Sequence, residues 1–409
     1  MDIAYPADAE AFRREVRDVL AQELPTGFRG IGSIVDLDEA KAFVAQWRTR
    51  LHARGLLGVA WPVEYGGRGL TRLHQVVLME ELARAGVPFG QPWDSMGIKQ
   101  LGNTLLHWGT EEQRQRFLPG LLSGEQTWCQ GFSEPGAGSD LAAVSTYAEL
   151  RDGQWRINGQ KIWTSHAMTA DWIYVLVRTD RQAPKHRGIS FLLCPLHQDG
   201  VEIRPIRHMN GGGEFCEVFF TDAVTGADNV VGPVNGGWKV SGTLLSHERG
   251  EEAATNPILF RAELDRLLAL ARHRGVDSDP VFRDRIAWCY ARVEIMRFLG
   301  YRILTQVLHG DGLGPAASIS KLYWSEYHQV VTQLALDIEG LDGLAPRGRA
   351  PVRTFRSDDP GADPLSSGSW WHVSLLARAG TIYAGTSQVQ RNILAESVLG
   401  LPREPQLVR

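Results

Sequence analysis

The 409-residue sequence has no long apolar run and almost no excess of charge. Its longest apolar stretches, such as Trp172–Val177 and Ile189–Leu193, are much shorter than the roughly 20 residues that a membrane-spanning helix needs. The 43 basic and 47 acidic residues give a formal net charge of −4, so there is no broad basic surface for a nucleic acid or an anionic membrane. We therefore expect no membrane span and no nucleic-acid partner.

Cysteine is also scarce, and no targeting segment is recognisable. The four cysteines are scattered along the chain, without a CxxC pair or the spacing of a metal site. This pattern favours reduced, buried thiols. The chain opens with Asp2, Asp8 and Glu10 and no apolar segment follows, so it resembles neither a secretory signal nor a transit peptide. Together these features predict a cytoplasmic protein.

The motifs of several large enzyme classes are missing. None of the 12 histidines belongs to an HExxH motif or another tight ligand cluster, so we expect no metal site. There is no GxSxG elbow, no Walker loop and no GxGxxG after a predicted strand. The sequence therefore gives no support to a hydrolase, an NTPase or a Rossmann dinucleotide-binding protein. An enzyme with this sequence would need a different cofactor.

Helical and strand-like patterns occupy separate regions of the chain. Apolar residues from Phe12 to Leu24 recur at helical intervals, and Thr110–Glu112 is typical of a helix start. Short β-rich runs begin near Gln126, and helical patterns return after Trp238, notably over Pro280–Leu308. This order predicts an α+β fold with segregated layers. We expect strands at Trp155–Ile157, Ile173–Arg178, Ile189–Cys194, Val201–Ile206 and Cys216–Phe220, and an exposed loop over 345–369.

Three segments are candidates for ligand binding. Residues 130–140 (QGFSEPGAGSD) are rich in glycine, which lets a backbone approach a ligand but is equally typical of a plain turn. Residues 161–166 (KIWTSH) place the Trp163 indole beside hydroxyl groups, although a tryptophan considered alone is more often a core residue. Residues 382–391 (IYAGTSQVQR) predict a helix start, whose free N–H groups suit a phosphate or a carbonyl oxygen, or simply a capped helix.

Taken together, the order, spacing and residues of these three segments resemble the acyl-CoA dehydrogenase family, and its bacterial members most closely. The resemblance covers essentially the whole chain, including 62–67 (PVEYGG), 108–113 (WGTEEQ) and 392–396 (NILAE). It implies an α+β, acyl-CoA dehydrogenase-like fold and an oxidoreductase of fatty acid or lipid metabolism. The implied domains are an N-terminal helical domain at 1–125, a central β-barrel-like domain at 126–238 and a C-terminal four-helix bundle at 239–409.

The resemblance also implies FAD as the cofactor and assigns its contacts residue by residue. Gln130, Phe132 and Ser133 would line the flavin ring, with Ser133 donating to its pyrimidine edge. Trp163 would cover one edge of the ring, and Ser165 would form a hydrogen bond near N5. Many family members have threonine at the positions of Ser133 and Ser165, so serine is a mild departure that keeps the hydroxyl donor.

Further implied contacts concern the rest of the cofactor, the substrate and the partners. Thr386 and Gln388 would hold the phosphate and adenosine portion of FAD. Arg272 would reach the FAD of a neighbouring subunit, although the aromatic residue that commonly follows it is missing here. Ser139 would face the pantetheine arm of the acyl-CoA. The implied assembly is a homotetramer or homodimer, or a hetero-oligomer with a paralogue, and the implied electron acceptor is an electron-transfer flavoprotein.

One position departs from the family pattern in a way that affects catalysis. Ala384 stands where many members have a catalytic glutamate, and alanine cannot take a proton. Glu248, directly before Arg249 at the start of a predicted helix, matches the alternative base position of isovaleryl- and long-chain-type members. The resemblance implies that Glu248 removes the α-proton while the Ala384 N–H polarises the thioester carbonyl. Hydride would pass from Cβ to flavin N5 and leave a trans-2-enoyl thioester. Arg249 would balance charge near the base or the CoA, or form a plain ion pair.

Two alternatives fit the same residues. The alanine at position 384 would suit a non-catalytic FAD-binding subunit of a hetero-oligomeric acyl-CoA dehydrogenase. The same fold also supports flavin monooxygenases and nitroalkane oxidases. Retention of Glu248 opposes both alternatives, although nitroalkane oxidation also needs a carboxylate base. The sequence leaves the acyl group open, whether short, branched, long, steroidal or polyketide-derived, and it leaves open whether CoA or an acyl-carrier protein bears that group.

Overall fold

The computed structural model describes residues 5–309, 316–352 and 359–403, without the side chains of 246–254, 307–308, 316–317 and 367. The chain forms two compact units, which we call the helical unit and the sheet unit. The helical unit comprises Met1–Gln46, Arg72–Pro88 and Arg249–Arg409, and the sheet unit comprises Trp47–Thr71 and Phe89–Glu248.

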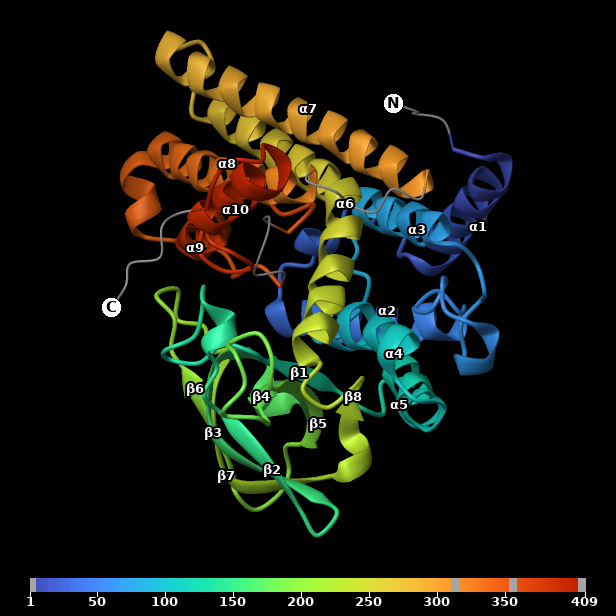
Figure 1. Ribbon diagram of the computed structural model, residues 1–409. Helices are drawn as coiled ribbons and strands as arrows, with labels where there is room; N and C mark the ends of the chain where they lie inside the picture. The colour runs from blue at the N-terminus through green and yellow to red at the C-terminus, as the bar shows by residue number, and fades with distance from the viewer. Residues whose placement is uncertain (1–4, 310–315, 353–358, 404–409) are drawn as a thin grey trace. The chain divides into compact units, whose positions relative to one another are not determined.

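Long helices build the helical unit (Figure 1). Helix α1 packs against α3, α7 packs against α8, and α8 also contacts α9 and α10. Two helices, α2 and α6, begin in one unit and end in the other. The bounds are α1 Ala7–Glu23, α2 Leu37–Ala53, α3 Arg72–Ala85, α6 Gly237–His273, α7 Pro280–Leu308, α8 Ala316–Glu339, α9 Ser367–Gly380 and α10 Ser387–Ile393.

An aromatic core holds the C-terminal helices of this unit together. Phe260 of α6 stacks on Trp324 and meets Tyr327 edge-on, with ring centroids 6.2 and 5.3 Å apart. Trp370 of α9 is fully buried, and the Arg266 guanidinium lies over its ring at 4.9 Å. Burial of each of these large side chains stabilises the fold by roughly 1.5–3 kcal/mol.

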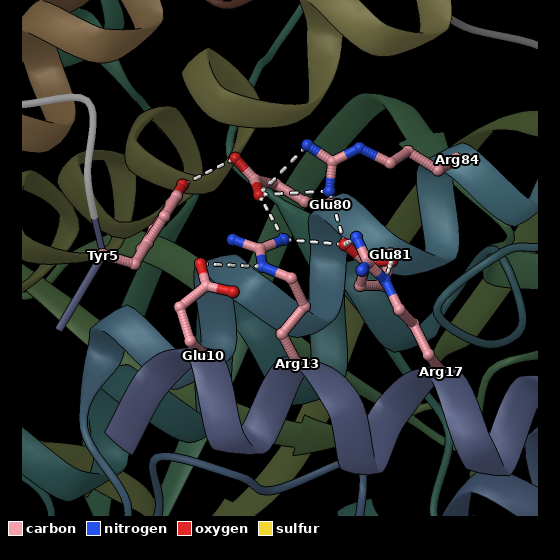
Figure 2. Close-up of polar contacts among 7 residues, drawn as sticks. All are labelled: Tyr5, Glu10, Arg13, Arg17, Glu80, Glu81 and Arg84. Atoms are coloured by element: carbon pink, nitrogen blue, oxygen red, sulfur yellow. Dashed lines mark hydrogen bonds and ion pairs between the residues drawn. The ribbon is translucent and has the colours of Figure 1, made fainter. Parts of the chain in front are cut away.

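A charged network joins α1 to α3, as Figure 2 shows. Buried Arg13 donates to Glu80 at 2.9 Å and to Glu81 at 2.7 Å. Tyr5 donates its hydroxyl to Glu80, and Arg17 donates to Glu81 at 2.8 Å. Burial alone would raise the pKa of Glu81, but Arg17 and Arg13 outweigh that effect and lower it. The N-terminal helix is thus fixed to α3 by charges as well as by apolar packing.

The sheet unit is built on one eight-stranded mixed sheet (Figure 1). The strand order is β6-β7-β3-β2-β4-β5-β8, and β1 pairs with β4 in parallel. The longest pair, β3 with β7, is antiparallel and has 12 residues in each strand. The bounds are β1 Trp128–Gly131, β2 Tyr147–Arg151, β3 Gln154–Ser165, β4 Trp172–Arg178, β5 Ile189–Pro195, β6 Val201–Ile206, β7 Phe215–Gly226 and β8 Val230–Val231, with helices α4 Asn103–Trp108 and α5 Glu111–Ser123.

The structure confirms the predicted fold class of helices, then a sheet, then helices. Helix α7 has the predicted bounds. Thr110 caps α5 in a reciprocal capping box with Gln113, whose N–H donates to Thr110 Oγ1 at 3.2 Å. All four cysteines are free and buried.

Within the described residues, no helix is long and apolar enough to cross a membrane, and no His, Cys, Asp or Glu cluster is arranged to hold a metal ion.

Some expectations about local structure are wrong. Strands β1 and β2 lie in the region where β-rich runs were expected, but neither is among the five strands named from the sequence. The loop at 345–369 is not simply exposed, because Asp359 is buried and accepts hydrogen bonds from Arg349 at 2.6 Å and from the Val352 amide at 2.8 Å. These hydrogen bonds tie the loop to the helical unit and satisfy the buried Asp359 carboxylate. The loop also ends early, since α9 begins at Ser367. Residues 353–358 lie outside the described part of the chain.

Candidate active site

The first predicted site segment, residues 130–140, begins in the last two residues of β1. Gln130 lies in β1 opposite Tyr174 of β4. A Cβ at Gly131 would come within 2.7 Å of Ile173, so packing of β1 on β4 requires glycine there, rather than the approach of a ligand. Phe132 is buried and meets the Tyr174 ring edge-on, with centroids 5.9 Å apart. The aromatic contact anchors the segment that follows.

Ser133 is the half-buried residue at which this segment leaves the strand. Its carbonyl accepts a hydrogen bond from the Ile162 amide of β3 at 2.9 Å. Within the described part of the chain, neither the amide nor the hydroxyl of Ser133 donates a hydrogen bond. Both donors can therefore serve a ligand, as expected for a residue that contacts a flavin.

A buried ion pair lies behind Ser133. Lys161 of β3 is fully buried, and its Nζ donates to Glu134 Oε1 at 2.7 Å. Burial alone would raise the pKa of Glu134, but Lys161 and Ser145 hold it at about 2, while burial lowers the pKa of Lys161 to about 8. The hydrogen bonds are those of a charged pair, because the ammonium donates three and the carboxylate accepts four. The other partners are Phe132 O at 3.2 Å and Leu176 O at 2.7 Å for Lys161, and Ser145 N and Oγ at 2.7 Å and Thr146 N at 3.0 Å for Glu134.

A β-bulge in β3 presents Trp163. Lys161 and Thr164 pair with β7 residues that are two apart, so Ile162 and Trp163 together oppose one residue of β7. Trp163 has a φ of 62° and is 57% exposed, which excludes the core interpretation. Ser165, half-buried, pairs with β7 beyond the bulge. The bulge therefore exposes the indole of the residue that directly follows Ile162, whose amide binds the Ser133 carbonyl.

A histidine cluster beside the bulge was not predicted. The His166 amide donates to the Glu214 carbonyl at 2.7 Å, and His208 Nδ1 lies 3.4 Å from Glu214 Oε2. The Phe215 ring lies 4.5 Å from that of His208 and 6.2 Å from that of Trp163. Burial lowers the pKa of His166, against the opposing effect of Glu214. The register of β3 and β7 brings these residues together, and no sequence spacing signals it.

Ser139 and Asp140 lie beside a basic loop between β4 and β5. Both residues are exposed, and Lys185 of the loop pairs with Asp140. Arg181 of the same loop lies over the Tyr147 ring at 4.6 Å. The exposed cations of this loop suit an anionic ligand near Ser139.

In the helical unit, a buried lysine holds the turn after α9. Lys321 Nζ donates to the Gly380 carbonyl at 2.9 Å and to the Gly385 carbonyl at 2.6 Å, so it bridges both ends of the turn. Ala384, within the turn, has a φ of 52°, and its carbonyl accepts from Gln390 Nε2 at 3.0 Å. The exposed Ala384 residue donates no hydrogen bond from its N–H within the described part of the chain.

The remaining predicted residues of this unit lie on α10 and α6. Thr386 caps α10, because its Oγ1 accepts from the Val389 amide at 3.1 Å. The capped-helix interpretation is therefore correct, while the Thr386 hydroxyl keeps its proton for another partner. Gln388 and Arg272 are both exposed, and Arg272 lies in the last turn of α6.

Glu248 and Arg249 lie inside α6, so the expectation that they stand at a helix start is wrong. The helix begins at Gly237 because Val240 and Leu244, four residues apart and fully buried, form its apolar face. The side chains of Glu248 and Arg249 lie outside the described part of the chain.

Each unit brings together its own share of the predicted site. In the sheet unit, Ser133 and Trp163 are joined through the Ile162 amide. In the helical unit, Ala384 and Thr386 share the turn that leads into α10. Arg272 lies on a different helix, and no hydrogen bond of the described residues connects it to that turn.

Comparison with protein families identifies the chain. Family models match three consecutive regions: the acyl-CoA dehydrogenase N-terminal domain at residues 6–125, the middle domain at 129–223 and the C-terminal domain at 235–399. The chain therefore belongs to the acyl-CoA dehydrogenase family.

Individual relatives define the class further. The acyl-CoA dehydrogenase IpdE1 of Mycobacterium tuberculosis is 42% identical over 97% of this chain and 99% of that protein. The structure of the Tcur3481-Tcur3483 steroid ACAD is 33% identical, covers 99% of this chain and 100% of that chain, and has a TM-score of 0.79. The ChsE4-ChsE5 complex from Mycobacterium tuberculosis is 28% identical, with coverages of 99% and 100% and a TM-score of 0.78. The protein is thus an enzyme, an acyl-CoA dehydrogenase.

Proposed function

We propose that the protein carries out the FAD-dependent α,β-dehydrogenation of an acyl-CoA to a trans-2-enoyl-CoA, with Glu248 as the base. The main observation in support of this proposal is the strained backbone of two predicted site residues. Six described non-glycine residues have positive φ, and all but Trp163 and Ala384 are Asp, Asn or His, which tolerate that conformation. Left-handed backbone costs roughly 1–2 kcal/mol at other residues, and such strain persists mainly at ligand and active sites. Both strained residues are predicted site residues.

Each unit offers groups that suit a part of FAD. Ser133 has an unused amide and hydroxyl for the acceptor edge of a flavin, Trp163 offers an exposed aromatic face, and Ser165 adds a hydroxyl near N5. Thr386 and Gln388 would contact the phosphate and adenosine portion. Gln130 and Phe132 would support the ring, and Arg272 would reach the FAD of another subunit. When bound, FAD supplies the hydride acceptor of the reaction.

Proton removal needs a base and a polarised thioester carbonyl, because an α-proton is too weakly acidic for a carboxylate acting alone. The Ala384 N–H, held in its turn by Lys321, is the proposed donor to the carbonyl. One such oxyanion donor is worth roughly 2.7–4 kcal/mol. Ala384 has no titratable group, so the base must come from elsewhere, and Glu248 is the residue that we assign. Arg249 would balance its charge.

For the substrate we propose the CoA thioester of a steroid-derived acyl group. A structure that matches this chain at 33% identity over 99% of its length is a steroid ACAD. Ser139 would contact the pantetheine arm, and the neighbouring Arg181 and Lys185 would attract the phosphates of CoA.

For the partners we propose a second acyl-CoA dehydrogenase chain and, as electron acceptor, an electron-transfer flavoprotein. The names of the two structural relatives, Tcur3481-Tcur3483 and ChsE4-ChsE5, each combine the names of two proteins. Trp288, Ile295 and Phe298 recur at helical spacing on α7 and are 38–48% exposed, a surface that a second chain would cover. Light scattering of the protein alone and with a co-expressed paralogue would test the pairing.

An anaerobic titration tests the proposed function. The purified protein should be yellow, and a steroid side-chain acyl-CoA should bleach its flavin faster than butyryl-CoA, isovaleryl-CoA or palmitoyl-CoA does. Mass spectrometry should find an enoyl product two hydrogens lighter than the substrate, and the free steroid acids serve as controls. A flavin that no acyl-CoA reduces would favour the non-catalytic subunit. Rapid turnover with oxygen and release of hydrogen peroxide would favour an oxidase.

A further inference from the structure

The buried Lys161–Glu134 pair lies directly behind the groups that the proposed function assigns to the flavin. Lys161 Nζ donates to the Phe132 carbonyl at 3.2 Å, and that carbonyl belongs to the same peptide group as the Ser133 amide. The residue after Lys161 is Ile162, whose amide donates to the Ser133 carbonyl at 2.9 Å. Trp163 comes next in the bulge. One buried cation is therefore connected to both flavin-facing positions.

The segment around Ser133 has little regular structure to hold it. β1 ends at Gly131, and Glu134 forms only an isolated bridge with Ala137. Lys161 and Glu134 supply the missing order, because their bonds reach β3, β4 and the Ser145 backbone. The Lys161 ammonium uses all three of its donors, and the Glu134 carboxylate uses all four of its acceptor sites. The pair therefore fits only one arrangement of the segment.

Stability alone does not account for the pair. Apolar residues of similar volume are often as stable as a buried ion pair or more so. The sheet unit contains a second buried pair, in which Arg48 donates to Asp94 at 2.8 Å. Arg48 also binds the Leu121 and Ser123 carbonyls. None of the described hydrogen bonds of Arg48 or Asp94 reaches a predicted flavin contact, so this second pair provides a matched control.

We propose that Lys161 and Glu134 are positioning residues that fix Ser133 and Trp163 against the flavin and strengthen the Ser133 amide as a hydrogen-bond donor. The second effect follows from polarisation, since a cation on a peptide carbonyl makes the N–H of the same peptide group a better donor. A stronger donor at the pyrimidine edge favours added negative charge on the ring. This proposal rests on the proposed function, because it presupposes that FAD binds at Ser133.

Two consequences separate positioning from simple structural support. Without the pair, the apoprotein should bind FAD more weakly, because Ser133 and Trp163 are no longer held in place. The bound flavin should also become harder to reduce, because the Ser133 amide has lost its polarising cation. A purely structural pair would change the thermal stability and leave the potential of the bound flavin unchanged.

The test is a double variant, Lys161→Met/Glu134→Leu, which removes both charges together and leaves no buried charge alone. The control is Arg48→Met/Asp94→Leu in the same unit. For both variants and the unmodified protein, circular dichroism and thermal melting report folding. Fluorescence titration of the apoprotein gives the FAD dissociation constant, and spectroelectrochemistry gives the potential of the bound flavin. We expect the Lys161→Met/Glu134→Leu variant to fold, to bind FAD at least about tenfold more weakly and to have a more negative flavin potential. The control variant should keep the unmodified affinity and potential.

A folded Lys161→Met/Glu134→Leu variant with unchanged FAD affinity, visible spectrum and potential would overturn the proposal. If that variant does not fold, Ser145→Ala is the second test, because it removes one donor to Glu134 at 2.7 Å and keeps both charges. We expect Ser145→Ala to produce a smaller shift of potential in the same direction, and no shift at all would also overturn the proposal. Failure of the unmodified protein to bind FAD would instead contradict the proposed function itself.

Discussion

Buried acidic side chains in this chain differ in how they are compensated. Glu134 has an ammonium and three further donors, whereas Glu339, at the end of α8, is 4% exposed and accepts no hydrogen bond from the described residues. Burial raises the pKa of Glu339 to about 7; Arg274 opposes this shift and Asp342 adds to it. Ionisation of this one carboxyl near neutral pH is therefore unfavourable in the folded protein.

This imbalance predicts a pH-dependent stability. Because the folded-state pKa of Glu339 lies above its ordinary value of 4.5, folding favours the protonated carboxyl, and this stability is lost as the pH rises through about 7. Glu339→Gln should therefore raise the free energy of unfolding by about 1–3 kcal/mol at pH 8 and by less than about 1 kcal/mol at pH 5. Urea unfolding at both pH values measures this. Equal effects at the two pH values would refute the prediction.

At the residue scale, the sequence indicates candidate site residues but not the backbone conformation in which the structure holds them. Ser133, Trp163 and Ala384 were predicted from motifs, since residue types and spacing are visible in one dimension. The positive φ values of Trp163 and Ala384 were not, because backbone strain is imposed by packing around the residue. The contact of His208 with Glu214 was also missed, because it depends on tertiary structure.

At the scale of elements, the N-terminal helix depends on a few charges. Arg13 is the buried member of the α1–α3 network, and it contacts two carboxylates that are themselves buried (Figure 2). Arg17 contacts Glu81 as well, but its side chain is 57% exposed. Water solvates the exposed Arg17 guanidinium, so its ion pair with Glu81 adds little to stability, whereas Arg13 is itself buried and contacts both carboxylates.

The two arginines should therefore differ sharply when truncated. Arg13→Met removes the buried cation that Glu80 and Glu81 share and leaves them only the more exposed Arg17 and Arg84, so it should cost about 1.5–3 kcal/mol of unfolding free energy. Arg17→Met changes the same residue type on the same helix and should cost less than about 1 kcal/mol. Chemical denaturation of both variants compares them. Similar losses in the two variants would show that the network does not hold α1 as described.

Elements were predictable where local signals are strong. Helix α7 begins with Pro280 at its first position, and Asp279 Oδ1 accepts from the Val281 amide at 2.8 Å, so the start of this helix was predictable from the sequence. Strand β1 was missed because it is only four residues long and is defined by its parallel pairing with β4. Helix α6 was predicted too short because its first turns, around Val240, follow directly on a Gly-rich turn.

At the scale of the whole molecule, family membership was predictable because the motifs extend along the chain. The division into units was not. The helical unit draws on three separate stretches of sequence, and such long-range pairing leaves no periodic signal. The acyl specificity also depends on the shape of a site rather than on any motif.

The central claim is that Glu248 takes the α-proton, and the rate of anaerobic flavin reduction by acyl-CoA tests it most directly. Glu248→Gln keeps the size of the side chain and removes the base. Asp265→Asn, an exposed acid of the same helix that pairs with Arg261, is the matched control. We expect both variants to bind FAD normally, with reduction slowed at least ~100-fold in Glu248→Gln and unchanged in Asp265→Asn. Reduction of Glu248→Gln at the rate of the unmodified protein would contradict the account.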